Sequence, residues 1–530
     1  MENKRNVLTN SLLIVLGMVF VFAFPGAVYG YESVLKFELK PGPYAVGFKV
    51  VDNYDYTRTY FGKFDQYGEK VKQKARPIQT CVWYPADAKK AGQKERMRFR
   101  DYAYLVATEL GARELTPAVK DEAVNGFFLF FSTPGYRKPE LDVLTEAVQD
   151  AEPAPGNFPL VVYGASINCP AFENSVLFEY LAGYGYIVVS SPCVGVASRF
   201  VETGATGAEA QARDILFLLG FMHDFPGVDH TKTALMGFSW GGMSAVLAAM
   251  RDTRIDAVVC IDGSIAYNKY MDDFITKSPY YNIDKMTMPL LFLRSKQIPP
   301  EISKRYGGQP QEKDNFFEDL KNSDAYHIRF NHLMHGNFCS AFIKFMDMKG
   351  PDKLESSPEE VNRSYNLACH YVHRFLDATI KGDTGALTYM SNSPQENNIP
   401  DGIIVKRFKK GSAPEPSFGE FIYRVKQEGF DKISAVYGEI KKEFPGFSLA
   451  EERLTDLAFL MSVQGKIEDV LLLLTFTLEV FPESSDAYYG LGEIYALKGD
   501  REAAIKALEK ALELNPRSFM AEKKLKELKK

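Results

Sequence analysis

The sequence of 530 residues lacks an excess of charge of either sign. Its 63 Lys and Arg residues are balanced by 68 Asp and Glu residues, which leaves a formal net charge of -5. The basic residues are scattered, apart from short runs at residues 406–410 and at the C-terminus. Because nucleic-acid binding depends on a concentrated basic surface, we expect no nucleic-acid partner.

Clustered metal ligands are also missing. The six cysteines are dispersed, with no C-x-x-C pair and no histidine at zinc-finger spacing. We therefore expect no metal site. Cys81 and Cys260 lie in apolar runs, where a thiol packs as a small hydrophobic side chain, and the spacing assigns no disulfide.

The N-terminus differs in kind from the rest of the chain. Two basic residues at positions 4–5 precede an apolar stretch at residues 12–24, and small residues follow it. The stretch is short for a membrane span, and no cysteine follows it that could carry a lipid. It predicts a signal peptide over residues 1–30, removed on export to the periplasm or the medium. An uncleaved membrane anchor is the alternative.

Short apolar strands alternate with helical segments from residue 160 to about 380, which predicts βαβ units and a mainly parallel sheet flanked by helices. Two strands expected to be antiparallel precede them, at residues 44–51 and 77–84. Clusters of Asn, Pro, Ser and Gly indicate a linker at residues 382–416. We therefore expect an α/β catalytic domain over residues 31–381.

A repeat follows the predicted linker. Gly465 and Gly499 are 34 residues apart, as are Pro482 and Pro516. That period, with a helix-turn-helix pattern, is typical of tetratricopeptide repeats. Residues 417–530 are thus predicted to form an all-α repeat domain, whose first unit is the weakest match. Such repeats bind a protein partner or support self-association, and both interpretations stay open.

The string Gly237-Phe238-Ser239-Trp240-Gly241-Gly242 stands between a predicted strand and a predicted helix. A sharp strand-to-helix turn needs small residues on both sides, so that the serine projects from the sheet in a strained conformation. Ser239 is therefore the candidate nucleophile. The N-terminus of the helix supplies backbone N–H groups for an oxyanion, and that of Trp240 is the first candidate.

A serine nucleophile needs a histidine base and an orienting carboxylate, in the chain order Ser, acid, His for α/β-hydrolases. Asp262 follows the predicted strand at residues 257–261, and a glycine after it permits a turn. His335 stands in a loop after the strand ending at Phe330, with His332 as the alternative. Such a site needs no cofactor.

Several patches of the sequence resemble the platelet-activating-factor acetylhydrolase family, within the wider dienelactone-hydrolase-like group. The patches are Tyr44-Ala45-Val46-Gly47, Arg76-Pro77-Ile78-Gln79-Thr80, Val82-Trp83-Tyr84-Pro85, Phe158-Pro159-Leu160-Val161-Val162, the Ser239 turn, Ile261-Asp262 and His335-Gly336-Asn337-Phe338.

The resemblance implies an α/β-hydrolase fold, a triad of Ser239, Asp262 and His335, and hydrolysis of short-acyl or phospholipid-like esters. The family usually has a Ser-His-Gly type turn where this chain reads Gly164-Ala165-Ser166-Ile167. The carried-over second oxyanion donor is the backbone N–H of Ile167, or that of Ser166.

Two further interpretations concern partners. The apolar run at residues 127–131 fits core packing, a cap over the acyl pocket or a surface for peripheral lipid contact. The insertion at residues 266–282 is another expected pocket wall. The alternative to an esterase is an inactive exported scaffold that binds partners through its helical repeats.

Overall fold

The computed structural model describes residues 37–60, 70, 74–130, 137–267, 275–299, 315–346, 356–412 and 415–530. The chain divides into two compact units, Met1–Ser412 and Ala413–Lys530. The predicted signal peptide lies outside the described residues. Within the described ranges, every helix falls short of the length and apolar character that a membrane span requires.

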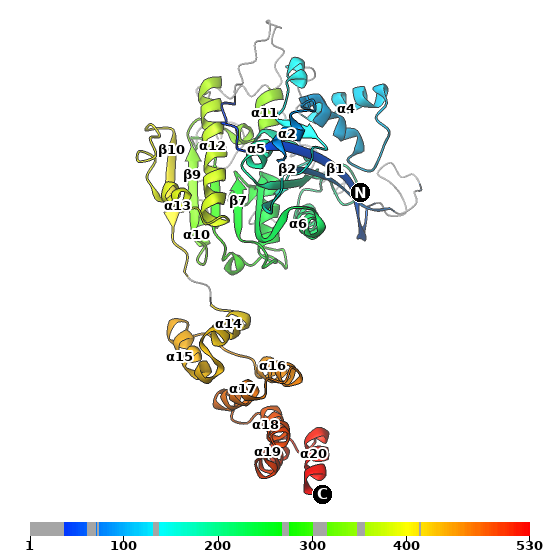
Figure 1. Ribbon diagram of the computed structural model, residues 1–530. Coiled ribbons are helices and arrows are strands. Elements are labelled where there is room, and N and C mark those ends of the chain that lie inside the picture. The colour runs from blue at the N-terminus through cyan, green and yellow to red at the C-terminus, as the bar shows by residue number, and fades with distance from the viewer. Residues whose placement is uncertain are drawn as a thin grey trace, which may run out of the picture. The chain divides into compact units, whose positions relative to one another are not determined.

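A ten-stranded sheet forms the centre of the first unit (Figure 1). Its strand order is β10-β9-β8-β7-β6-β4-β5-β2-β1-β3. The strands from β5 to β9 are parallel, whereas β2 runs antiparallel to both β1 and β5, as predicted for the first pair. The strands are β1 (Ala45–Thr59), β2 (Ala75–Ala86), β3 (Ala147–Gln149), β4 (Phe158–Gly164), β5 (Ile187–Ser191), β6 (Val228–Phe238), β7 (Ala257–Ile261), β8 (Leu290–Arg294), β9 (Ala325–Phe330) and β10 (Ile404–Lys409).

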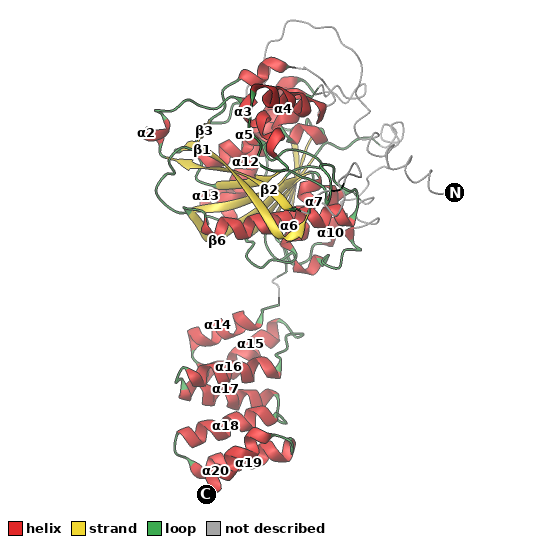
Figure 2. Ribbon diagram, turned by 90° about the vertical axis from the view of Figure 1, so that its right-hand side faces the viewer, coloured by secondary structure: helices red, strands yellow, loops and turns green. Residues whose placement is uncertain are grey.

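Helices cover both faces of this sheet, which explains why its central strands are almost continuously apolar and buried. One face carries α5 (Ser175–Gly183) and α12 (Pro358–Thr379), and the other carries α6 (Ala205–Phe221) and α7 (Trp240–Ala249) (Figure 2). The remaining helices of the unit are α2 (Ala88–Ala91), α3 (Phe99–Ala103), α4 (Pro117–Phe130), α10 (Asn315–Asp319), α11 (Ser340–Phe345) and α13 (Thr384–Ser391).

The winding of the sheet reverses at β4. The chain leaves β4 for β5 on one side and then returns across β4 to β6 on the other. Open α/β sheets form their ligand crevice at such a point, outside the carboxyl ends of the strands. The loops that follow β4 and β6 therefore meet at the expected position of an active site, where Gly164 is paired with Gly237.

The apolar run at residues 127–131 contributes to the core through its first two residues. Phe127 and Phe128 are buried on α4, and Phe127 packs against Phe99 and Phe345. Leu129 is exposed, and Phe131 lies outside the described residues. The expectation of core packing therefore holds for Phe127 and Phe128.

The predicted linker at residues 382–416 requires correction. Within it, α13 packs against α12, and β10 adds an antiparallel strand to the sheet beside β9. Some of the Asn and Gly residues, such as Asn397, Asn398 and Gly402, form turns between these elements. The sequence does not predict β10, because this strand lies at the edge of the sheet and is mostly polar. Its pairing with β9 is therefore determined by the tertiary structure. The boundary between the two units falls between Ser412 and Ala413 instead.

The second unit is all-helical, and its helices stack one after another (Figure 2). Gly465 and Gly499, the glycines 34 residues apart, end two of these helices with φ values of 77° and 81°. L-residues rarely adopt that conformation, which explains glycine at the same place in successive repeats. The helices are α14 (Phe418–Glu428), α15 (Ile433–Glu443), α16 (Glu451–Val463), α17 (Ile467–Val480), α18 (Ser485–Leu497), α19 (Arg501–Leu514) and α20 (Phe519–Lys529).

Candidate active site

Ser239 occupies the turn between β6 and α7, with φ 55° and ψ -119°. A non-glycine residue with positive φ is strained, and such strain persists only where surrounding structure imposes it. The flanking glycines allow the turn to close. A Cβ atom on Gly237 would overlap the backbone of Gly241, and one on Gly241 would overlap the carbonyl of Gly164. The small residues required by the turn are therefore required sterically.

The structure brings the three predicted triad residues together. Nε2 of His335 lies 2.9 Å from Oγ of Ser239, and Nδ1 of the same ring lies 2.7 Å from Oδ2 of Asp262. The imidazole thus bridges the hydroxyl and the carboxylate, at distances suited to proton transfer and orientation. The histidine begins the short helix η7 (His335–Phe338), after β9.

The carboxylate of Asp262 is completely buried and has donors at both oxygens. Oδ1 accepts hydrogen bonds from the guanidinium of Arg294 and, at 3.1 Å, from the backbone N–H of Ser295. Oδ2 faces His335 and lies 3.4 Å from the hydroxyl of Tyr267. Burial raises the pKa of Asp262, but Arg294 and His335 together hold it well below its usual range. The carboxylate is therefore ionised at neutral pH.

Sequence reasoning gave no role to Arg294, and it expected Tyr267 only as part of a pocket wall at residues 266–282, of which residues 268–274 lie outside the described residues. Arg294 is 4% exposed, and its guanidinium lies 5.0 Å from the centre of the Tyr267 ring. A basic residue at the end of the strand beside the acid's strand is a usable signal, because parallel neighbours place their carboxyl ends together.

The alternative base, His332, is engaged elsewhere. Its Nδ1 lies 3.5 Å from the carboxylate of Glu360 and 3.4 Å from the hydroxyl of Ser356, near the start of α12. His373, on α12, is also engaged away from Ser239, because its Nε2 lies 2.9 Å from the carboxylate of Asp377.

The loop after β4 contains both proposed second oxyanion donors. The backbone N–H of Ser166 donates to the carboxylate of Glu173 over 2.7 Å, so it is engaged. Among the described residues, the backbone N–H of Ile167 donates to no protein acceptor, and the residue is half-buried. Of the two alternatives, the N–H of Ile167 is therefore the remaining candidate; the other expected donor, Trp240, begins α7.

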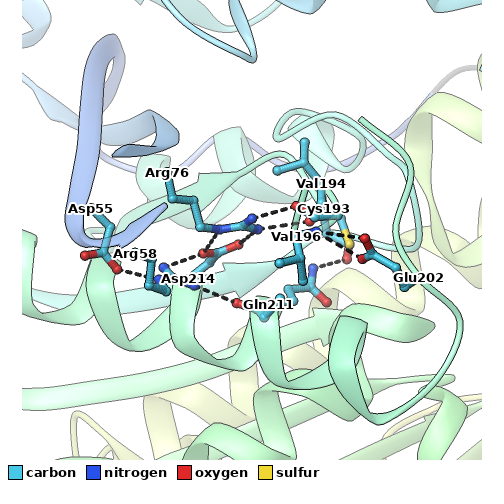
Figure 3. Close-up of polar contacts among 12 residues, drawn as sticks. Asp55, Arg58, Arg76, Cys193, Val194, Val196, Glu202, Gln211 and Asp214 are labelled. Atoms are coloured by element: carbon cyan, nitrogen blue, oxygen red, sulfur yellow. Dashed lines mark hydrogen bonds and ion pairs between the residues drawn. The ribbon is translucent and has the colours of Figure 1, made fainter. Parts of the chain in front are cut away.

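A network of ion pairs and hydrogen bonds supports the loop that follows β5 (Figure 3). The guanidinium of Arg76 donates to Asp214 over 2.6 and 2.7 Å, and also to the carbonyls of Gly195 and Val194. Arg58 donates to the same aspartate over 2.7 Å. The buried Arg76 thus connects this loop to Asp214 on α6, and Arg58 joins β1 to the same carboxylate.

The loop after β5 in turn contacts the loop that carries Ile167. Arg199 donates to the backbone carbonyl of Asn168, and the side chain of Asn168 accepts from the N–H of Val201 over 2.7 Å. From the other direction, the side-chain amide of Gln211 donates to the carbonyl of Ala165 over 2.6 Å. The candidate oxyanion loop is therefore held by the loop after β5 and by α6.

No group of His, Cys, Asp and Glu in the described part of the chain is arranged to hold a metal ion. All six cysteines are buried thiols, without a disulfide between them.

The first unit is therefore an α/β-hydrolase fold with a serine turn at its switch point. Residues 151–293 match the family model described as Esterase FrsA-like, and residues 485–518 match the tetratricopeptide repeat. The esterase match includes Ser239 and Asp262 and ends before Arg294 and His335.

Curated relatives match over short segments. Esterase FrsA of Photorhabdus laumondii is 26% identical over 147 residues, which cover 25% of this chain and 34% of that protein. Esterase FrsA of Photobacterium profundum is 33% identical over 85 residues, covering 16% and 19% of the two chains. The chain thus spans about a third or less of the length of these relatives.

Among solved structures, the chain is similar to a ferulic acid esterase from Streptomyces cinnamoneus, with a TM-score of 0.46 and 19% identity. The similarity covers 71% of this chain and all of that one.

Proposed function

We propose that this protein is a serine esterase that cleaves carboxylic esters through an acyl-enzyme. One observation carries the proposal: a single imidazole lies 2.9 Å from the Ser239 hydroxyl and 2.7 Å from the Asp262 carboxylate. A serine hydroxyl is a weak nucleophile until a base takes its proton, and this arrangement provides the base and its orienting partner. The similarity of residues 151–293 to FrsA-like esterases supports the same reaction class.

In the proposed mechanism, Ser239 attacks the ester carbonyl while His335 accepts its proton. Asp262 holds the tautomer in which Nδ1 carries the proton and stabilises the imidazolium that forms. The backbone N–H groups of Trp240 and Ile167 stabilise the oxyanion of the tetrahedral intermediate. His335 returns the proton to the leaving alcohol, and water then releases the acyl group by the same steps in reverse order.

The test is hydrolysis of p-nitrophenyl acetate by the wild type, Ser239→Ala and Ser244→Ala. Ser244 lies on α7 and is buried, and its hydroxyl has no hydrogen-bond partner among the described residues, so its removal is a control for loss of a serine hydroxyl near the site. We expect Ser239→Ala to lose several orders of magnitude in kcat, and the control to keep wild-type turnover. A fluorophosphonate probe should label the wild type and the control but not Ser239→Ala. Equal turnover by the wild type and Ser239→Ala would show that another group is the nucleophile.

We further propose short-acyl or phospholipid-like esters as substrates, as the resemblance to platelet-activating-factor acetylhydrolases suggests. The test compares kcat/KM for p-nitrophenyl acetate, butyrate and octanoate, and for phosphatidylcholines with acetyl or palmitoyl at the second glycerol carbon. We expect the shortest acyl group to be preferred in both series. A preference that rises with acyl length would refute this assignment while leaving esterase activity intact.

The helical repeats are proposed to make a protein contact. Large apolar side chains are exposed on α14, α16, α18 and α20, among them Tyr423, Phe459 and Val463. Exposed apolar patches mark interaction surfaces. Light scattering of the full chain and of a Phe459→Lys, Val463→Lys variant tests self-association: a dimer lost in the variant supports it. If both are monomers, contact between copies is excluded.

The scaffold alternative requires a wild type that neither labels with fluorophosphonate nor turns over esters.

We also propose export after cleavage of residues 1–30, on the basic and apolar pattern described above. Intact-mass measurement of the chain recovered from a bacterial host tests this. A mature chain that still begins at Met1 and sediments with membranes would favour the anchor instead.

A further inference from the structure

Glu173 lies in the segment between β4 and α5 and is completely buried. Its Oε1 accepts hydrogen bonds from the hydroxyl of Tyr163 at 2.8 Å and from the backbone N–H of Ser166 at 2.7 Å. Its Oε2 accepts from the Ser166 hydroxyl at 2.5 Å. The carboxylate thus holds Ser166 by both its backbone and its side chain. The next peptide unit carries the N–H of Ile167. The two hydrogen bonds that fix Ser166 therefore restrict the direction of the Ile167 N–H.

A carboxylate in this position is costly to keep. Burial raises the pKa of Glu173 to about 7, and hydrogen bonds from Ser166 and Tyr163 oppose that rise. No basic side chain pairs with the carboxylate within the described ranges. Glutamate is almost never fully buried unless it is paired, and an apolar residue would fill the same space at lower cost. Packing alone therefore does not explain the residue.

The same segment also reaches the part of the chain that follows the histidine. The backbone carbonyl of Glu173 accepts from the N–H of Ala341 at 2.9 Å. The side-chain amide of Asn174 donates to the carbonyl of Phe338 at 3.0 Å, and its oxygen accepts from the N–H of Ser340 at 3.1 Å. One buried dipeptide thus connects the loop after β4 with the end of η7, which begins at the proposed base.

From these contacts we propose that Glu173 is a positioning residue for ester hydrolysis, which holds the Ser166–Ile167 peptide so that the Ile167 N–H meets the oxyanion. The proposal rests on the esterase function proposed above. Glu173 touches neither the substrate nor the proton in transit, and it acts through the geometry of the loop. Donors positioned before the reaction stabilise the transition state more than the bound ester, so their misplacement lowers kcat more than it raises KM.

Glu179 provides a matched control. It lies six residues further on, on α5, is 6% exposed, and accepts hydrogen bonds from the Tyr102 hydroxyl at 2.8 Å and the Glu146 N–H at 2.9 Å. Burial raises its pKa to about 7 as well. Its carboxylate is thus matched in burial and hydrogen bonding, but it makes no contact with the loop after β4.

The experiment compares the wild type, Glu173→Gln and Glu179→Gln, each as the full chain. It measures kcat and KM for p-nitrophenyl acetate, binding of a trifluoromethyl ketone that forms a tetrahedral adduct with serine, and urea unfolding. A glutamine carries an NH2 donor in place of one acceptor oxygen, so either the Ser166 N–H or the Ser166 hydroxyl loses the acceptor to which it donates. We expect kcat of Glu173→Gln to fall by about 10- to 1000-fold, with KM within about twofold and ketone binding weakened in parallel. We expect Glu179→Gln to retain the wild-type kcat.

The possible failures are distinguishable. Turnover by the wild type and the control, with unchanged kcat and ketone binding in Glu173→Gln, overturns the positioning role and leaves the esterase standing. No turnover by any of the three overturns both proposals. If Glu173→Gln does not fold, Ser166→Ala decides, because it removes only the hydroxyl donor. A lower kcat at unchanged KM then supports the role, and a wild-type kcat overturns it.

Discussion

Replacing Arg294 by Met should destabilise the first unit strongly, because it leaves the buried carboxylate of Asp262 without its cation. The two side chains are 5% and 0% exposed. Breaking a buried pair by removing one partner costs about 3–5 kcal/mol in the free energy of unfolding. The matched control is Arg96→Met, which breaks the Arg96–Glu146 pair with side chains 44% and 63% exposed. An exposed pair of this kind contributes about 0–1 kcal/mol.

The effect should depend on pH with a definite sign. In the wild type the pKa of Asp262 is lowered, so its charge stabilises the folded state fully above the unfolded value of about 4. That contribution is lost only as pH falls through the lowered folded pKa. Burial raises the pKa of Asp262 and Arg294 is the strongest influence that lowers it, so in the variant the pKa rises. The stability difference should therefore be largest near pH 7 and shrink towards pH 4.

The assay is urea unfolding followed by tryptophan fluorescence at pH 7 and pH 4. Both tryptophans, Trp83 and Trp240, are buried in the first unit, so the signal reports that unit and not the repeats. A loss below about 1 kcal/mol at pH 7, equal to that of the exposed control, would refute the reasoning. So would a loss of the same size at both pH values, since the destabilisation would then have no connection with the charge of Asp262.

Two further predictions follow from packing. Gly241→Ala should prevent the formation of folded, active protein, because its Cβ would overlap the carbonyl of Gly164. Gly220→Ala in α6 is the contrasting variant: its Cβ would meet open space, so the free energy of unfolding should rise by about 0.5–1 kcal/mol. Soluble yield and urea unfolding check both, and an active Gly241→Ala enzyme would contradict the steric argument. Burial raises the pKa of the Cys193 and Cys369 thiols to about 12, so a thiol reagent at pH 8 should react only slowly with the native protein. Once urea unfolds the chain, the same reagent should label all six cysteines. Rapid native labelling would show that the thiols are accessible.

The sequence by itself was sufficient where local chemistry dictates the structure. The apolar strands alternating with helices predicted the parallel sheet, and the glycines around Ser239 predicted a strained turn that is found at φ 55°. The period of 34 residues predicted the helical repeats, because Gly465 and Gly499 each supply the positive φ that ends a helix. These features depend on steric limits and hydrophobic periodicity within a few residues of chain.

Only the tertiary structure decided which distant side chains meet. His332 and His335 are three residues apart, yet only His335 lies within hydrogen-bonding distance of the serine, because η7 turns it toward β6 while His332 faces α12. Arg294, Asn174 and the edge strand β10 likewise acquire their partners across many intervening residues. Local pattern specifies how each strand and turn is built, whereas burial and strand order determine which of their ends come together and which charges must be paired there.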